Sequence, residues 1–125
     1  MSDDKAAEEH GTRLNKGKLP IGLPSSFAQE GLARHMGQSL IKYDKHNWAK
    51  GLDIAEVIES LERHILDLKR GILHGKDSEG LEYATVDAIH FNSMVLSHFH
   101  HTGQWIKFDR NVEYNTVVGN RLSED

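Results

Sequence analysis

The chain has 125 residues, a formal net charge of −4 at pH 7, and a composition that is 38% hydrophobic and 27% charged. This length and composition predict one soluble globular domain, and the acidic balance without a basic stripe predicts no direct nucleic-acid binding. Because the sequence contains no cysteine, it excludes disulfides, thiolate nucleophiles and cysteine-based zinc sites, which fits a cytoplasmic protein.

The first 24 residues lack helical periodicity. Residues 1–12 are acidic and small, and we expect a disordered lead there. We expect no signal peptide, because this lead is charged, and no membrane span, because no apolar run approaches the roughly 20 residues that a bilayer requires. Residues 13–24 contain both prolines of the chain, which predicts a loop.

Two helices are predicted after this loop. The first begins at an N-cap serine, Ser25 or Ser26, and runs to about Tyr43. After a turn over residues 44–51, Asp53 caps a second helix that ends near Gly71 to Gly75. Apolar residues recur in this helix every three or four positions and form one stripe, which comprises Ile54, Val57, Ile58, Leu61, Ile65, Leu68 and Ile72.

A third helix is predicted from about Leu81 to Phe99. It is apolar on nearly every side, which indicates burial. Residues 103–118 are rich in aromatic and β-branched residues and could form short strands or a partner-binding arm. We therefore expect an all-α catalytic domain over residues 13–102, completed by self-association, and a C-terminal tail or oligomerisation arm over residues 103–125.

Paired carboxylates on the second helix are candidates for a metal site. Glu59 and Glu62 lie one turn apart, so their carboxylates can approach one another, and a hard divalent cation would make that arrangement favourable. The alternative is a solvated face on which Glu59 pairs with Arg63.

Asp87 is the candidate acid of the third helix. A buried carboxylate costs several kcal/mol unless it is paired, protonated or bound to metal. His90 lies one turn after it and Tyr83 one turn before it. The alternative is therefore a hydrogen bond from Asp87 to His90 or Tyr83 that only shapes the core.

Several further polar residues could contact a substrate. His64 beside the apolar stripe and Asn92 in the buried helix are either satisfied core residues or ligand contacts. Trp48, after Asn47, could stack on a base or anchor the packing of a turn.

Two short loops carry charge that could complete such a site. Asp77 and Glu79 occupy a glycine-flanked loop between the second and third helices, where they could form a turn or close a metal site. Lys16 and Lys18 flank a glycine and could bind a polyphosphate, although such a segment can also be a flexible loop.

The order of these motifs resembles the phage dATP/dGTP diphosphohydrolase family, the MazZ branch of the MazG-like all-α nucleoside triphosphate pyrophosphohydrolases. The resemblance covers about residues 11–99. Its motifs are Asn15-Lys-Gly-Lys18, Lys42-Tyr43, Asn47-Trp-Ala-Lys-Gly51, Ser60-Leu-Glu-Arg-His64, the acidic loop from Asp77 to Gly80, and Asp87-Ala-Ile-His-Phe-Asn92.

The resemblance implies a homodimer or homotetramer that hydrolyses dGTP or dATP to the monophosphate and pyrophosphate with Mg²⁺ or Mn²⁺. It also implies a phage setting in which dGMP feeds synthesis of 2-aminoadenine DNA. Carried over from the superfamily, Glu59 and Glu62 hold metal from one helix and Asp87 from the next. Ala84 stands where the superfamily has a glutamate, so Asp77, Glu79 or Glu82 would supply the missing carboxylate.

The residues divide the other roles of a hydrolase as follows. Lys16, Lys18 and Arg63 would neutralise phosphate charge, while Glu59 or Glu62 would accept the proton of the attacking water. Purine selection would come from Asn92, Asn47 or Trp48, or from a neighbouring subunit.

Two alternatives to this function are open. One is a non-enzymatic helical module for oligomerisation or interaction. The other is a His/Asp-type metal phosphohydrolase, which the chain could build from His64, Asp87 and His90.

Overall fold

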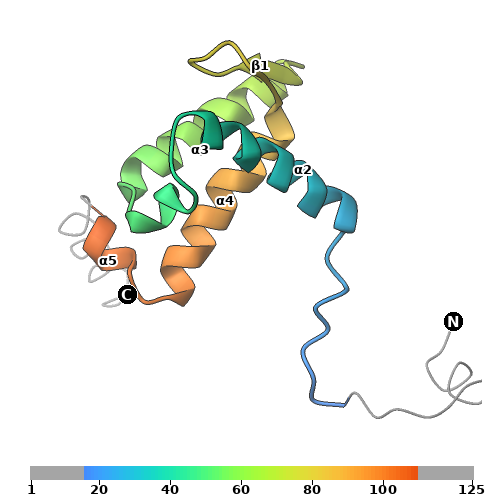
Figure 1. Ribbon diagram of the computed structural model, residues 1–125, viewed down its shortest axis with the longest axis vertical. Coiled ribbons are helices and arrows are strands. Elements are labelled where there is room, and N and C mark those ends of the chain that lie inside the picture. The colour runs from blue at the N-terminus through green and yellow to red at the C-terminus, as the bar shows by residue number, and fades with distance from the viewer. Residues whose placement is uncertain (1–15, 110–125) are drawn as a thin grey trace, which may run out of the picture.

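Three long helices and one β-hairpin make up the computed structural model, which describes residues 16–109 (Figure 1). The predicted all-α class is confirmed, apart from the small hairpin. In chain order the elements are α2 (Ser26–Gln38), η1 (Ser39–Ile41), η2 (Asn47–Lys50), α3 (Ile54–Lys69), β1 (His74–Lys76), β2 (Glu82–Ala84), α4 (Thr85–His101) and α5 (Trp105–Phe108).

The predicted N-caps of the first two helices are confirmed. The Ser25 hydroxyl accepts a hydrogen bond from the Ala28 N–H at 3.2 Å, and the Asp53 carboxylate accepts one from the Ala55 N–H at 3.2 Å. Each bond satisfies one of the backbone donors that a helix leaves open at its start. These local signals therefore fix where α2 and α3 begin.

The predicted extension of the first helix to Tyr43 is wrong. Helix α2 ends at Gln38, and the chain tightens into the 3₁₀ turn η1. Gly37 lowers the helix propensity at this point, and the Ser39 hydroxyl donates to the Met36 carbonyl at 2.7 Å. A serine that competes for a helix carbonyl in this way favours the end of a helix.

The predicted start of the third helix at Leu81 is also wrong. Residues 82–84 form β2, which pairs antiparallel with β1 so that Gly75 faces Tyr83, and α4 begins at Thr85. The Thr85 N–H donates to the Leu73 carbonyl at 2.9 Å and its hydroxyl to the Ile72 carbonyl at 2.8 Å. These bonds attach the start of α4 to the connection that follows α3.

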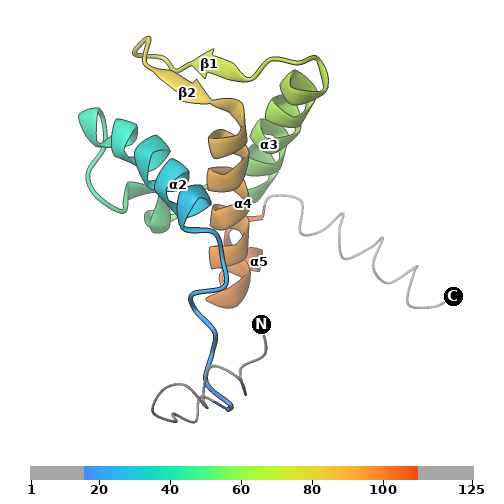
Figure 2. The ribbon, with the colours of Figure 1, turned by 90° about the vertical axis from the view of Figure 1, so that its right-hand side faces the viewer.

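Helix α4 lies between α2 and α3, with the hairpin across one end of the helices (Figure 2). The core forms mainly where α3 and α4 meet. Its buried hydrophobic residues are Ile54, Val57, Ala88, Val95 and Phe99.

The C-terminal part of the described chain packs back onto this core. In the short helix α5, the centroid of the Phe108 ring lies 5.0 Å from the centroid of the Phe99 ring. Phe108 also lies so close to Gly51, which has a φ of 128°, that a Cβ there would overlap the ring. Residues 105–108 are helical, so the short strands that were one of the two options for residues 103–118 do not form there. The rest of the predicted tail and the predicted lead over residues 1–12 lie outside the described residues.

The apolar stripe of α3 is buried over only half of its length. Ile54 is 0% exposed, whereas Ile65 and Leu68 in the second half of the helix are 39% and 36% exposed. Ile72, which the sequence placed on this stripe, lies beyond the end of α3 at Lys69 and is 43% exposed. Residues 16–109 thus leave the second half of this stripe uncovered. Since burial of apolar area is the main stabilising contribution in folding, this half contributes less to the stability of the single chain.

A second apolar segment extends away from the helices. Leu19, Ile21 and Leu23 precede α2 and are 74–80% exposed, and both views show this segment leaving the helical body (Figures 1 and 2). No helix within residues 16–109 is long and apolar enough to cross a membrane.

Candidate functional site

A cavity of about 340 Å³ opens between the end of α2, the middle of α3 and the hairpin. The side chains that matter for its chemistry are His35, Lys42, His64, Asp77, Glu79 and Tyr83. A neighbouring cavity of about 220 Å³ shares His35 and Tyr83 and is also lined by Asp87 and Arg34. We call these two adjoining cavities together the hairpin site.

The Tyr83 ring is the centre of the hairpin site. It stands edge-on between the rings of His35 and His64, with a centroid separation of 5.6 Å on each side and interplanar angles of 85° and 88°. On the paired strand, a Cβ at Gly75 would overlap the Tyr83 hydroxyl. Only glycine at position 75 therefore leaves room for this ring between the histidines.

Both histidines have a pKa below the ordinary value. Burial lowers the pKa of His35, and nearby His64 lowers it further, while the carboxylates of Asp87 and Asp77 act in the opposite direction. Burial also lowers the pKa of His64, the nearby Asp67 carboxylate acts in the opposite direction, and the Arg63 guanidinium lowers the pKa further. Because the lowered pKa favours the neutral imidazole near pH 7, each can accept a proton. Their Nδ1 atoms are buried without a hydrogen-bond partner in the described part of the chain.

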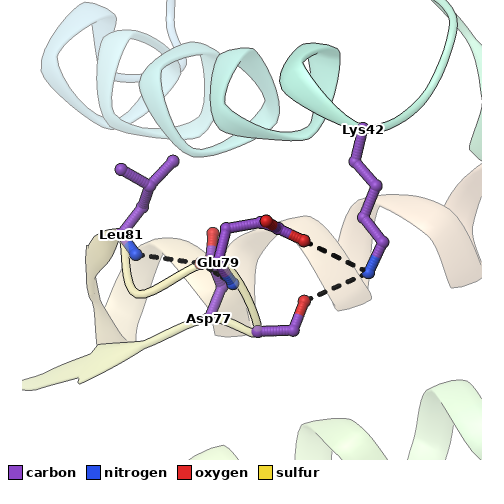
Figure 3. Close-up of polar contacts among 5 residues, drawn as sticks. Lys42, Asp77, Glu79 and Leu81 are labelled. Carbon is purple, nitrogen blue, oxygen red and sulfur yellow. Dashed lines mark hydrogen bonds and ion pairs between the residues drawn. The ribbon is translucent and has the colours of Figure 1, made fainter.

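Lys42 connects the end of η1 to the loop of the hairpin (Figure 3). Its ammonium donates to the Ser78 hydroxyl at 3.1 Å and lies 3.8 Å from a Glu79 carboxylate oxygen. The Asp77 carboxylate accepts hydrogen bonds from the N–H groups of Glu79 at 2.9 Å and Leu81 at 3.0 Å. Asp77 thus forms the turn, as the sequence allowed, and also lines the site.

Asp87 is half-buried, not fully buried as the apolar sequence around it predicted. Its carboxylate lies against the backbone of α2 at Gly31, where a Cβ would overlap it. The titratable neighbour whose pKa it raises is His35, from α2. The alternative for Asp87, a hydrogen bond with His90 or Tyr83, does not occur among the hydrogen bonds of residues 16–109.

The paired carboxylates that the sequence predicted as metal ligands on the second helix are exposed. Glu59 and Glu62 lie on the solvent side of α3, and Glu59 is 3.9 Å from the Arg63 guanidinium, with both of these side chains mostly exposed. Within residues 16–109, no three His, Asp or Glu side chains are placed to hold one metal ion. The described residues of one chain therefore do not make a complete metal site.

The other predicted contacts lie apart from the hairpin site. Asn92 is buried, and its amide donates to the Ala88 carbonyl at 3.0 Å and to the Ser60 hydroxyl at 3.4 Å. It thus ties α4 to α3 in the core. Lys16 and Lys18 are exposed on the extended segment before α2.

Asn47 and Trp48 line a different cavity of about 550 Å³ on the other side of η1. Trp48 also packs on the core, and its ring meets that of His98 edge-on with a centroid separation of 4.8 Å.

Sequence reasoning missed His35 and the role of Lys42. His35 has no local signal, since nothing in helix α2 indicates that Tyr83 and His64 will surround it. Lys42 could be found only as part of the Lys-Tyr motif, because its contacts with Ser78 and Glu79 join residues 36 and 37 positions apart.

Comparison with known proteins identifies the family of this chain. The family model for the dATP/dGTP diphosphohydrolase N-terminal region matches residues 8–109. The chain belongs to this family. A relative, a dATP/dGTP diphosphohydrolase of Salmonella phage PMBT28, is 32% identical over 74 residues, which cover 59% of this chain and 25% of the relative. The chain thus matches about a quarter of that relative's length. No solved structure matches it significantly.

Proposed function

We propose that this chain hydrolyses a purine deoxynucleoside triphosphate, dGTP or dATP or both, to the monophosphate and pyrophosphate. The observation that carries the proposal is membership of the dATP/dGTP diphosphohydrolase N-terminal family over residues 8–109. The hairpin site supports it, because it combines cationic, acidic and neutral imidazole groups at one cavity of about 340 Å³.

The residues of the hairpin site divide the work of such a hydrolysis. Lys42 and Lys76 line the cavity and would neutralise the oxygens of the triphosphate. His35 and His64, whose lowered pKa keeps them neutral near pH 7, would accept the proton of an attacking water. Cleavage between the α- and β-phosphates then leaves the monophosphate and pyrophosphate.

We further propose that the reaction requires Mg²⁺ or Mn²⁺, which would shield the triphosphate charge and activate water. Asp77, Glu79 and Asp87 line the hairpin site, while Glu59 and Glu62 lie exposed on α3. Since no three acidic or histidine side chains converge within residues 16–109, a complete site needs ligands from a second copy or from outside these residues.

We also propose that the chain associates with itself. The uncovered half of the α3 stripe, with Ile65 and Leu68, offers apolar surface that a second copy would bury in a homodimer or homotetramer. Placement in the MazZ branch, a host-cytoplasm location and a supply of dGMP for 2-aminoadenine DNA follow from the motif resemblance and belong to the proposal. We propose no direct contact with nucleic acid.

Incubation of the purified chain with each dNTP, with Mg²⁺ or Mn²⁺ and with excess EDTA, tests this function. We expect dGTP or dATP to yield the monophosphate and pyrophosphate, with no turnover in EDTA. Stepwise release of orthophosphate, or of intact triphosphate, would replace this reaction with that of a His/Asp-type phosphohydrolase. No turnover of any dNTP would favour the interaction module.

A further inference from the structure

We propose that the cavity of about 550 Å³ beside η1 binds the purine base of the substrate. This cavity, which we call the aromatic cavity, lies between the second half of α2, the turn from η1 to η2, and α4. Three aromatic side chains from these different segments line it, namely Tyr43, Trp48 and Phe91. The inference rests on the proposed function, because it assigns the base of the same substrate.

The lining of the aromatic cavity suits a flat heteroaromatic ring. Its walls are mostly apolar, with Met36, Leu40 and Leu52 beside the aromatic residues. Aromatic side chains stack favourably on the flat face of a nucleobase. Its volume is in the range of small-molecule sites, which are largely apolar with a few polar groups that fix orientation.

One polar side chain at this cavity can contact the edge of a base. The amide of Asn47 offers both a donor and acceptors. Trp48 also lines the cavity, while its indole Nε1–H is enclosed by protein and has no acceptor among residues 16–109. The contribution of Trp48 to base binding is therefore stacking of its ring.

The position of the aromatic cavity relative to the hairpin site fits one nucleotide. The two cavities share Ser39 and Tyr43 in their linings. On the far side of this shared wall, Lys42 and Lys76 provide positive charge for phosphate oxygens. A purine nucleotide could therefore place its base among the aromatic residues and its phosphates at the lysines, crossing over η1.

Binding of deoxynucleosides without phosphate tests this assignment separately from hydrolysis. The full chain, labelled with ¹⁵N, is titrated with deoxyguanosine, deoxyadenosine and deoxycytidine, and the two indole N–H resonances are followed. We expect a purine nucleoside to shift the Trp48 resonance saturably. Trp105 is the internal control, because its Nε1–H already donates to the Asp109 carboxylate at 3.1 Å and it does not line the cavity.

Gly37 provides a variant that fills the cavity without removing a core residue. It lines the aromatic cavity, and a Cβ there would have no atom within 4 Å. Gly37→Leu should therefore fold, since leucine also has the higher helix propensity, and should weaken purine nucleoside binding by about tenfold or more. Ala28→Leu, at an exposed position of the same helix outside the cavity, is the matched control and should bind like the wild type.

The assignment is overturned if neither purine nucleoside binds, if binding leaves the Trp48 resonance unmoved, or if Gly37→Leu binds as tightly as Ala28→Leu. These results leave hydrolysis itself untouched. Conversely, nucleoside binding at Trp48 without turnover of any dNTP would reject the proposed reaction and keep the base site.

Discussion

Gly31 and Gly37 lie two turns apart on α2, and their replacement by alanine should have opposite effects on stability. A Cβ at Gly31 would overlap the Asp87 carboxylate, whereas a Cβ at Gly37 would meet nothing within 4 Å. Gly37→Ala should therefore raise the free energy of unfolding by about 0.5–1 kcal/mol, which is the ordinary gain for such a change in a helix.

Gly31→Ala gains a similar helix propensity but must displace the Asp87 side chain. Overpacking of this kind costs about 1–3 kcal/mol, so the net change should lie between about zero and a loss of about 2 kcal/mol. The half-buried carboxylate can move toward solvent, and for this reason we expect the variant to fold. The two variants should differ in unfolding free energy by about 1–3 kcal/mol, the overpacking cost.

Urea unfolding at one fixed protein concentration measures this difference, because self-association would make stability depend on concentration. The decisive control is Asp87→Ala, which removes the obstructing carboxylate. In that background Gly31→Ala should become stabilising, as Gly37→Ala is, and the double-mutant cycle isolates the contact. Equal stabilisation by Gly31→Ala and Gly37→Ala in the wild-type background would refute the proposed packing of α2 on Asp87.

Three further changes test the core, the caps and the histidines. Phe99→Ala should lower the free energy of unfolding by about 3–5 kcal/mol, because the ring is fully buried; a loss below about 1 kcal/mol in urea would place Phe99 outside the core. Asp53→Ala should cost about 1 kcal/mol by removing the N-cap of α3, and Asp53→Asn should retain most of that stability. Because burial lowers the pKa of His35 and His64 below 6.5, the unfolded chain binds more protons under mildly acidic conditions. The melting temperature should therefore fall as the pH drops below about 6.5, and His35→Gln with His64→Gln should flatten this dependence; an unchanged slope would contradict burial of the neutral forms.

The parts of the fold that depend on adjacent residues could be predicted from the sequence. Ser25 and Asp53 cap helices by bonding to N–H groups two or three residues away, so the starts of α2 and α3 were predictable. The hairpin was not, because strands of three residues are too short to show an alternating pattern. Thr85 begins α4 only because Ile72 and Leu73 are nearby to accept its hydrogen bonds.

The hairpin site was predictable only in part for the same physical reason. His64, Asp77, Glu79 and Asp87 were expected to be functional, and the structure places all four along its two cavities. His35 was missed, because its surroundings come from two elements distant in sequence. The metal roles of Glu59 and Glu62 remain predictions, since both side chains are exposed on α3.

Asp77 offers the clearest way to separate a structural role from a catalytic one in the hairpin loop. Its carboxylate accepts two backbone hydrogen bonds, from Glu79 and Leu81, and the amide oxygen of Asp77→Asn can still accept them. If Asp77 only forms the turn, Asp77→Asn should keep near wild-type stability and turnover. Asp77→Ala should lose about 1 kcal/mol of stability, because one of the two lost hydrogen bonds is exposed and the other is part-buried, so water can reach the freed donors. If it also binds the metal of the proposed reaction, Asp77→Asn should remain stable but should require more Mn²⁺ for half-maximal turnover, because a neutral amide is a weaker ligand for a hard cation than a carboxylate.

A Mn²⁺ titration of dGTP and dATP hydrolysis by the two variants, beside their urea unfolding, distinguishes the roles. An unchanged Mn²⁺ requirement in Asp77→Asn would assign Asp77 to the turn alone.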